Sequence, residues 1–452
     1  MPNTIAIRRE DLSKKGEKRV AIPPSLVSTF IELGNSVLVQ PNIHPKTGEE
    51  KRAFSDQAYL ASQARVQEDI SDADIIFGLK EIDSHKILPN KVYFFFSHTH
   101  KGQIKNRSML KTLVERNVTL IDYELIVDEE EKRILTSFTF FAGYAGMIDS
   151  LWTYGQRMKN RQIMHVFEQI PQSIDWQNLD LFKRQLSDLG DHIRAYGTPA
   201  SLPPCICCFL GNGKTSTGAQ EIFDLLPTTS IRLDQLQEVF ENGDKKQVYK
   251  LVLDIPQLYR FKAESSLAAK EWTDAELFRA YLQNPNEFES NLDQVFPYCS
   301  IMMNCILWSP EYPRLISRDQ AHEWYSQNQT LEVIGDITCD PEGAIEFSQE
   351  TWIDQPVFIY NPRTRQTSIG FEGEGIAVMA VTNLPCEFPK DASNLFGENL
   401  APLLSGIAQS NLAAASLAKA NFPQPIEDAT ILWQGNFTDK YAYMKAYLEE
   451  MA

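Results

Sequence analysis

Short apolar runs alternate with helical patterns over the first 146 residues of the chain. The runs at 4–8, 36–40, 73–79, 92–96 and 118–121 have the length and composition of strands, and the apolar residues of 23–33 and 106–116 have helical spacing. Strands that alternate with helices pack as a parallel sheet covered by helices. The pattern therefore predicts an α/β domain in this part of the chain.

A second α/β unit is predicted after a helical stretch at 147–194. A buried strand at 205–210 precedes a glycine-rich turn at 211–218 and an amphipathic helix at 219–226, and further strands are predicted at 229–233, 249–253 and 331–337. After Asp336 the pattern changes to antiparallel pieces at 356–360 and 367–371, and helical patterns close the chain. The fold class is therefore α/β, with two Rossmann-like parallel-sheet domains.

Composition excludes several classes of partner. The 452 residues, 43% of them hydrophobic, suffice for two or three domains, and 60 acidic against 43 basic residues give a net charge of -17. This field repels phosphate, which disfavours nucleic acid and anionic membranes, and an anionic substrate would need a local basic pocket. No apolar run approaches the length of a membrane span, and no signal-peptide segment is present. We expect a cytoplasmic protein without a membrane partner.

The seven cysteines predict neither a metal site nor a disulfide framework. Cys205, Cys207 and Cys208 lie within one apolar run and have no matching pair at metal-ligand spacing. A structural zinc site needs four converging ligands. We expect these cysteines to be small buried hydrophobic residues.

The glycine-rich turn is the first motif with a chemical interpretation. Gly211, Asn212, Gly213 and Gly218 follow a buried strand and precede a helix, as in turns that let the backbone approach a pyrophosphate. The spacing is wider than G-x-G-x-x-G. A P-loop is the alternative, but it requires a glycine where this chain has Cys208.

The end of the strand after the glycine turn is where the adenosine ribose normally lies. An acid there favours the free 2′-hydroxyl, and an arginine favours a 2′-phosphate. Arg232 and Asp234 both lie there, so the motif predicts a cofactor, NADP(H) or NAD(H), without deciding between them.

Lys80 and His98 are the candidate acid and base. They follow the apolar runs 73–79 and 92–96, and strand ends are where open α/β sheets bind ligands. A lysine whose pKa is lowered by neighbouring cations, and a histidine, can both transfer protons at neutral pH. His100 shares a face with His98 on an extended strand end, so the pattern leaves open which imidazole acts.

Isolated charges supply weaker candidates. Arg19 and Arg133 could bind carboxylates, and Glu17 and Glu124 could receive an ammonium group, although each could equally be a solvated charge. Asp336 could be a helix cap, a turn residue or a substrate contact.

Several phrases occur in order along nearly the whole chain. They are Ile7-Arg8-Arg9-Glu10, Glu17-Lys18-Arg19-Val20, Gly78-Leu79-Lys80-Glu81, Phe96-Ser97-His98-Thr99-His100-Lys101-Gly102-Gln103, Ile121-Asp122-Tyr123-Glu124, Gly211-Asn212-Gly213, Gly335-Asp336-Ile337-Thr338-Cys339-Asp340 and Asn383-Leu384-Pro385-Cys386-Glu387-Phe388-Pro389. Together these phrases resemble the saccharopine dehydrogenase and lysine–2-oxoglutarate reductase family. The likeness is strongest to the reductase half of aminoadipic semialdehyde synthase, and more distant to alanine dehydrogenase and transhydrogenase.

The resemblance implies a domain organisation and a reaction. It implies a discontinuous substrate domain of residues 1–146 and 337–452, and a dinucleotide-binding domain with connector helices at 147–336, with a cleft between the two. The implied reaction is condensation of lysine with 2-oxoglutarate to an imine, followed by hydride transfer that gives saccharopine. These three small molecules are then the expected partners.

The resemblance also implies roles for individual residues. Lys80 and His98 are the catalytic pair, which favours His98 over His100. The substrate contacts are Arg19, Lys101, Glu124, Arg133 and Asp336.

Two other functions remain open at this level. A related enzyme could act on another amino acid and 2-oxo acid pair, or the chain could be a dinucleotide-sensing module without catalysis. The sequence also leaves open the direction of the reaction and whether the chain forms a homo-oligomer.

Overall fold

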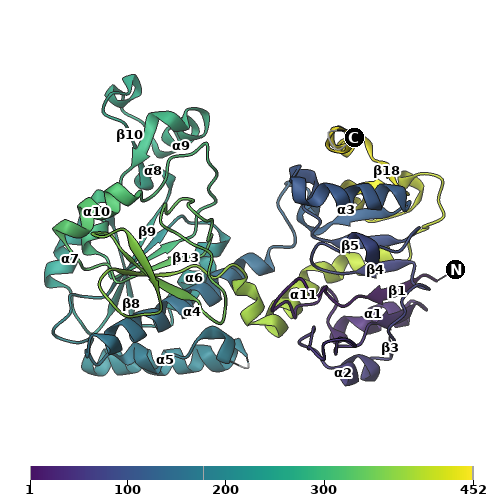
Figure 1. The fold of residues 1–452 in the computed structure, drawn as a ribbon, viewed down its shortest axis with the longest axis horizontal. Helices are drawn as coiled ribbons and strands as arrows, with labels where there is room; N and C mark the ends of the chain where they lie inside the picture. Colours follow the sequence, from purple (N-terminus) through teal and green to yellow (C-terminus); the bar gives the residue numbers. More distant parts are fainter. Residues whose placement is uncertain (1, 177, 450–452) are drawn as a thin grey trace. The chain divides into compact units, whose positions relative to one another are not determined.

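The structure is a computed structural model that describes residues 2–176 and 178–449. It divides into two compact units (Figure 1): unit 1 contains the residues up to Phe138 and those from Pro389 onward, and unit 2 is Thr139–Phe388. The chain leaves unit 1 once and returns once, so unit 1 is discontinuous in sequence.

Unit 1 is built on an eight-stranded sheet in the order β18-β17-β6-β5-β4-β1-β2-β3. Strands β1 to β6 are parallel, and β17 and β18 add an antiparallel edge. The five strands predicted in the first 146 residues are all confirmed. The bounds are β1 Thr4–Ile7, β2 Ser36–Val39, β3 Arg65–Val66, β4 Ile75–Phe77, β5 Val92–Phe95, β6 Thr119–Asp122, β17 Thr430–Trp433 and β18 Asn436–Phe437.

Helices cover both faces of this sheet. Ile7 belongs to a core that includes residues of α1 (Val27–Glu32) and α11 (Pro389–Ala408), whereas Ala6 belongs to a core that includes residues of α3 (Ile104–Glu115). Burial on two faces is why these strands are continuous apolar runs rather than alternating ones. The shorter helices are α2 Asp56–Ala61, α12 Gln424–Asp428 and α13 Lys445–Glu449.

Unit 2 is built on a second eight-stranded sheet, in the order β15-β14-β16-β13-β12-β7-β9-β8. The strands are β7 Ile206–Leu210, β8 Thr228–Ile231, β9 Val248–Leu253, β12 Ile301–Asn304, β13 Val333–Asp336, β14 Val357–Asn361, β15 Gln366–Ile369 and β16 Ile376–Met379. All run in the same direction except β14, which pairs antiparallel with both β16 and β15. The two sheets and their helices confirm the predicted α/β class.

The principal helices of unit 2 flank this sheet. They are α4, which begins in unit 1 (Ser137–Asn160), α5 Leu179–Tyr196, α6 Lys214–Phe223, α7 Leu236–Asn242, α8 Ile255–Leu258, α9 Asp274–Gln283 and α10 Arg318–Gln327. A separate two-stranded ladder pairs β10 (Tyr259–Phe261) with β11 (Phe288–Ser290). Within the described residues, no helix is both long and apolar enough to cross a membrane.

The predicted domain boundaries are corrected by the pairing of β16. Residues 337–388 were expected in the substrate domain, but β16 pairs with β13 in parallel, with Val333 opposite Ala377. The β14–β15 hairpin then extends the same sheet. Residues 139–146 also belong to unit 2, as part of α4. Unit 1 therefore resumes at Pro389 rather than at residue 337.

The cysteine expectation is confirmed for the apolar run of β7. Cys205, Cys207 and Cys208 are at most 2% exposed. Burial raises the pKa of the Cys205 thiol to about 12, so it is a neutral thiol at physiological pH.

Candidate functional site

Polar side chains gather where the parallel strands of unit 1 end. The segments after β1, β4, β5 and β6 carry most of the predicted acid, base and substrate residues. Strands β4 and β5 are adjacent, with Ile75 opposite Val92, so the segments that contain Lys80 and His98 leave the same edge of the sheet. This confirms that the two strand ends are neighbours.

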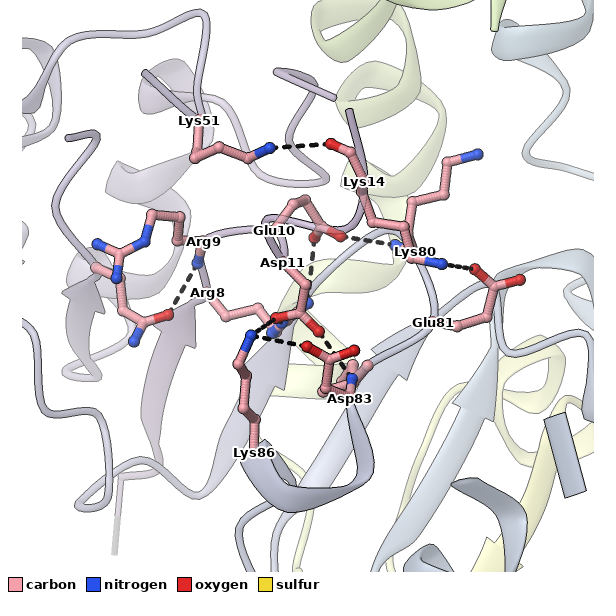
Figure 2. Close-up of polar contacts among 12 residues, drawn as sticks. Arg8, Arg9, Glu10, Asp11, Lys14, Lys51, Lys80, Glu81, Asp83 and Lys86 are labelled. Carbon is pink, nitrogen blue, oxygen red and sulfur yellow. Dashed lines mark hydrogen bonds and ion pairs between the residues drawn. The ribbon is translucent and has the colours of Figure 1, made fainter. Parts of the chain in front are cut away.

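A buried carboxylate fixes the backbone at Lys80. Glu10, which follows β1, accepts hydrogen bonds from the backbone N–H groups of Leu79 at 2.8 Å and Lys80 at 3.0 Å (Figure 2). Burial raises the pKa of Glu10. Figure 2 draws no hydrogen bond or ion pair to Nζ of Lys80. The backbone of Lys80 is held while its amine extends from this network.

Glu81 connects the end of β4 to His98. Its Oε1 lies 2.8 Å from Nδ1 of His98, and its Oε2 lies 2.6 Å from Nζ of Lys14. Burial acts to raise the pKa of Glu81, but the bonds to His98 and Lys14 outweigh it and hold the pKa well below its usual range. The ionised carboxylate favours a proton on Nδ1, which leaves Nε2 of neutral His98 as an acceptor.

The backbone of His98 has an uncommon conformation. Its φ is +51°, in the left-handed region, and its N–H donates to Oδ2 of Asp122 at 3.1 Å. Non-glycine residues in this region cost energy and cluster at functional sites. The turn therefore directs the His98 side chain to Glu81 at an energetic cost.

His100 has different partners. Its Nδ1 lies 3.7 Å from Oδ2 of Asp122, and its Nε2 lies 3.6 Å from Oε2 of Glu124. The two imidazoles are thus directed to different strand ends, His98 toward β4 and His100 toward β6. Of these two imidazoles, His98 is the one that bonds to Glu81, the residue next to Lys80.

Three predicted substrate contacts form one cluster around Glu124. Nζ of Lys101 lies 2.7 Å from Oε2 of Glu124, and Nη2 of Arg133 lies 3.0 Å from its Oε1. Lys101 and Arg133 are partly exposed, whereas Glu124 is mostly buried. The cluster combines one buried carboxylate with two cations that solvent can reach.

Arg19 forms a separate, buried ion pair. Its Nε and Nη2 donate to the two oxygens of Glu17 at 2.8 and 2.6 Å, and its guanidinium lies 4.3 Å from the centre of the Phe138 ring. Burial acts to raise the pKa of Glu17, but Arg19 and, to a lesser degree, Lys80 lower it to about 2.

Asp336 belongs to unit 2 and is fully buried at the end of β13. Its Oδ1 accepts from Nδ2 of Asn304 at 2.7 Å and from Oγ1 of Thr338 at 3.3 Å, and its Oδ2 accepts from the Ser348 hydroxyl. Burial raises its pKa. These contacts match the turn-residue interpretation.

The glycine turn lies between β7 and α6. Gly211 has a φ of +98°, and a Cβ there would lie 2.8 Å from Cγ2 of Ile306. A Cβ at Gly213 would meet nothing within 4 Å, so the first residues of the turn leave open space before α6. Gly218 serves packing instead, because a Cβ there would lie 2.5 Å from the carbonyl oxygen of Phe140. The turn fits a pyrophosphate at the start of a ten-residue helix.

A cavity of about 700 Å³ lies beside the glycine turn. It is lined by Asn212, Ile231, Arg232, Leu233, Asp234, Leu251, Val252, Leu253, Asp254, Gln257 and Gln294. The volume is within the range of small-molecule sites. The predicted cofactor residues Asn212, Arg232 and Asp234 therefore share one cavity.

The strand order differs from the one that the sequence suggested. Arg232 and Asp234 follow β8, but β8 pairs with β9, and β9 is the neighbour of β7. Arg232 and Asp234 also bond to each other, with Nη2 2.8 Å from Oδ2, and both are mostly exposed. Asp254, which follows β9, lines the same cavity and was not among the predicted residues, although the apolar run 249–253 ends at it.

Comparison with known proteins identifies the family. The family models for the alanine dehydrogenase/PNT N-terminal domain and C-terminal domain match residues 6–145 and 268–440. Fold and matched domains define an α/β protein with an N-terminal and a C-terminal domain of one family. The chain belongs to the alanine dehydrogenase/PNT family, and the predicted resemblance to saccharopine dehydrogenases and aminoadipic semialdehyde synthases is confirmed by relatives that bear those names.

Curated relatives fall into two groups. Alpha-aminoadipic semialdehyde synthase of Arabidopsis thaliana is 32% identical over 95% of this chain and 40% of its own length, and the mitochondrial enzyme of Bos taurus is 31% identical over 98% and 48%. The chain thus spans less than half of these relatives. Saccharopine dehydrogenase [NAD(+), L-lysine-forming] of Neurospora crassa is 21% identical over 89% of this chain and 91% of its own length.

Solved structures show the same fold. An L-alanine dehydrogenase matches with a TM-score of 0.62 and 17% identity, over 99% of this chain and all of its own. A transhydrogenase from Sinorhizobium meliloti matches with a TM-score of 0.56 and 16% identity, over 96% of this chain and all of its own.

Proposed function

We propose that the chain interconverts L-lysine plus 2-oxoglutarate and saccharopine, with NAD(H) or NADP(H) as the cofactor. The observation that carries this proposal is the edge of the unit 1 sheet, where an amine, an oriented imidazole and several cations come together. The names of the semialdehyde synthases and saccharopine dehydrogenases support the choice of substrates.

The cations of unit 1 suit substrates that carry several carboxylates. The fork of Arg19 is bonded to Glu17, whereas Lys101 and Arg133 are accessible beside Glu124 and can contact a carboxylate. The carboxylate of Glu124 can receive an ammonium group of the amino acid. These local charges answer the requirement for a basic pocket in a protein with a net charge of -17.

Imine formation needs proton transfer at two atoms. The ε-amine of lysine loses protons as its nitrogen bonds to the ketone carbon, and the former ketone oxygen gains protons and leaves as water. Lys80 and Nε2 of His98 are the groups that we assign to these transfers. Glu81 is a positioning residue, because it acts on the substrates only through the orientation of His98.

The glycine turn and its cavity are the groups that would hold the cofactor. Asn212 and Gly213 would contact the pyrophosphate, together with the free N–H groups at the start of α6. The bound cofactor supplies the hydride that reduces the imine carbon, while a protein group delivers the proton to nitrogen.

Turnover assays test the proposal. The folded chain is mixed with NADH or NADPH, 2-oxoglutarate and lysine, and consumption of the reduced cofactor and formation of saccharopine are followed. We expect both to occur in equal amounts. Failure with both cofactors would overturn the proposal, and turnover with another amine donor but not with lysine would assign the chain to a related amino-acid dehydrogenase.

A further inference from the structure

Two buried carboxyl groups of unit 2 face each other where α4 meets the short 3₁₀ helix η12 (Leu384–Glu387). Asp149 of α4 is 0% exposed, and Glu387 of η12 is 1% exposed. The two side chains are hydrogen bonded to each other. Because a carboxylate has no proton to donate, this bond requires that one of the two groups is a protonated carboxyl.

Apart from each other, the two carboxyl groups have little hydrogen bonding. Oδ1 of Asp149 accepts a hydrogen bond from the backbone N–H of Ser173 at 2.8 Å. Among the residues that the structure describes, no N–H or O–H group donates to Oδ2 of Asp149 or to either oxygen of Glu387. A buried carboxylate without a donor is costly, whereas one proton between the two groups satisfies both.

The charges around the pair also favour a retained proton. Burial, followed by the charge of Asp149, raises the pKa of Glu387 well above its usual range. The titratable groups that act on the pair are its own members, on α4 and η12, and the exposed Asp175 of η6 (Ser173–Asp175). All three are acids, and each negative charge makes loss of the proton more costly. The pair therefore keeps one proton at neutral pH.

Close packing of η12 on α4 brings the two carboxyl groups together. A Cβ at Gly146 would lie 3.3 Å from Cδ1 of Leu384, so the glycine lets η12 approach the helix. Gly146 and Asp149 are three residues apart on α4 and share a face of that helix. Leu384 and Glu387 are likewise three residues apart on η12, where such residues eclipse each other. The Leu384 contact therefore aligns Glu387 with Asp149.

The pair lies on the two segments that connect unit 2 to unit 1. Unit 2 begins at Thr139, within α4, and ends at Phe388, the residue after Glu387. Asp149 thus belongs to the helix that carries the chain into unit 2, and Glu387 belongs to the last turn before the chain leaves it. A bond between the two side chains joins the two connecting segments to each other.

We propose that Asp149 and Glu387 share one proton at neutral pH and form a pH-sensitive link between α4 and η12. While the proton is present, the carboxyl group of one residue donates to the carboxylate of the other and holds the connecting segments together. When the proton is lost at high pH, two like charges face each other in a buried site, and η12 loosens from α4. The link is independent of the proposed function, because it involves neither substrate nor cofactor.

Infrared difference spectra between the wild type and Glu387→Gln test the shared proton. Glutamine keeps the size of the side chain and can donate to Asp149 from its amide. We expect the wild type at about pH 7 to show the carbonyl band of a protonated carboxyl group that Glu387→Gln lacks. In Asp149→Asn this band should disappear at a pH at least about one unit lower than in the wild type, because the neighbouring negative charge is gone. Equal spectra of the wild type and Glu387→Gln, or an unchanged titration in Asp149→Asn, would overturn the shared proton.

Hydrogen exchange of residues 383–388 tests the link itself, with rates corrected by an unfolded peptide of the same sequence. Protection of this segment in the wild type should fall at least about tenfold between about pH 7 and about pH 10, since a buried glutamate can hold its proton up to about pH 9. Protection in Glu387→Gln should stay constant, because an amide does not titrate. Glu323→Gln, which removes an exposed acid of α10, is the matched control and should behave like the wild type. Protection that stays constant in the wild type, or that falls equally in Glu387→Gln, would overturn the link.

Discussion

The buried ion pair between Glu17 and Arg19 should contribute strongly to the stability of unit 1. The pKa of Glu17 is about 2 against an ordinary value of 4.5, and the carboxylate is fully buried. Each pKa unit corresponds to about 1.4 kcal/mol, so the ionised pair contributes about 3 kcal/mol at neutral pH. Glu17→Gln removes the charge and keeps the size, and it leaves the buried Arg19 without its carboxylate partner.

The neighbouring pair of Lys18 and Glu50 provides a matched control. Its atoms are 3.8 Å apart and both side chains are well exposed. Glu50→Gln should therefore lower the stability of unit 1 by well under ~1 kcal/mol, as expected for a surface salt bridge. The loss in free energy of unfolding should therefore be larger for Glu17→Gln than for Glu50→Gln by about 2 kcal/mol or more.

Native-state hydrogen exchange of strands β1 and β4 measures this difference, because it reports the opening of unit 1 separately from unit 2. The pKa of Glu17 is lower in the folded state, so its contribution is present above about pH 4.5 and disappears as the pH falls toward about 2. The loss caused by Glu17→Gln should shrink over that window. A loss no larger than that of Glu50→Gln at neutral pH would refute the reasoning.

Three further predictions concern the catalytic groups and one buried acid, Asp149. Lys80→Met and His98→Gln should each lower kcat by about 10²-fold or more, whereas His100→Gln should lower it less; steady-state rates check this. Glu81→Gln should lower kcat with little change in the dissociation constant of the cofactor, measured by titration. Burial raises the pKa of Asp149 to about 6, so the protonated carboxyl stabilises the fold at low pH, and this stabilisation is lost as the pH rises from about 4 to about 6. The melting temperature of Asp149→Asn should therefore fall less over this pH range than that of the wild type.

The strand ends of unit 1 could be predicted because buried parallel strands are continuous apolar runs. The runs that precede Lys80 and His98 end within a residue or two of the observed strands β4 and β5. Polar residues that follow such strands share one edge of the sheet, so their grouping follows from topology. The topology does not decide between His98 and His100, because their directions depend on the turn in which His98 takes a φ of +51°.

The strand order of unit 2 could not be predicted from the order of the sequence. The strand that follows β7 in the chain is β8, yet long-range packing inserts β9 between them. The consequence for the site is large, because the acid beside Gly211 is Asp254 rather than Asp234. The boundary at Pro389 was missed for the same reason: β16 joins the sheet of unit 2 through a pairing that no local pattern specifies.

Arg19 and the Glu124 cluster differ in how accessible their cations are to a substrate. Both oxygens of Glu17 accept hydrogen bonds from Arg19, and both residues are buried, so this pair mainly fixes the orientation of the guanidinium. Glu124 faces two cations, Lys101 and Arg133, and both are accessible to solvent. A substrate carboxylate can therefore contact them without displacing a buried partner. The Glu124 cluster should therefore contribute more than Arg19 to the attraction of an anionic substrate.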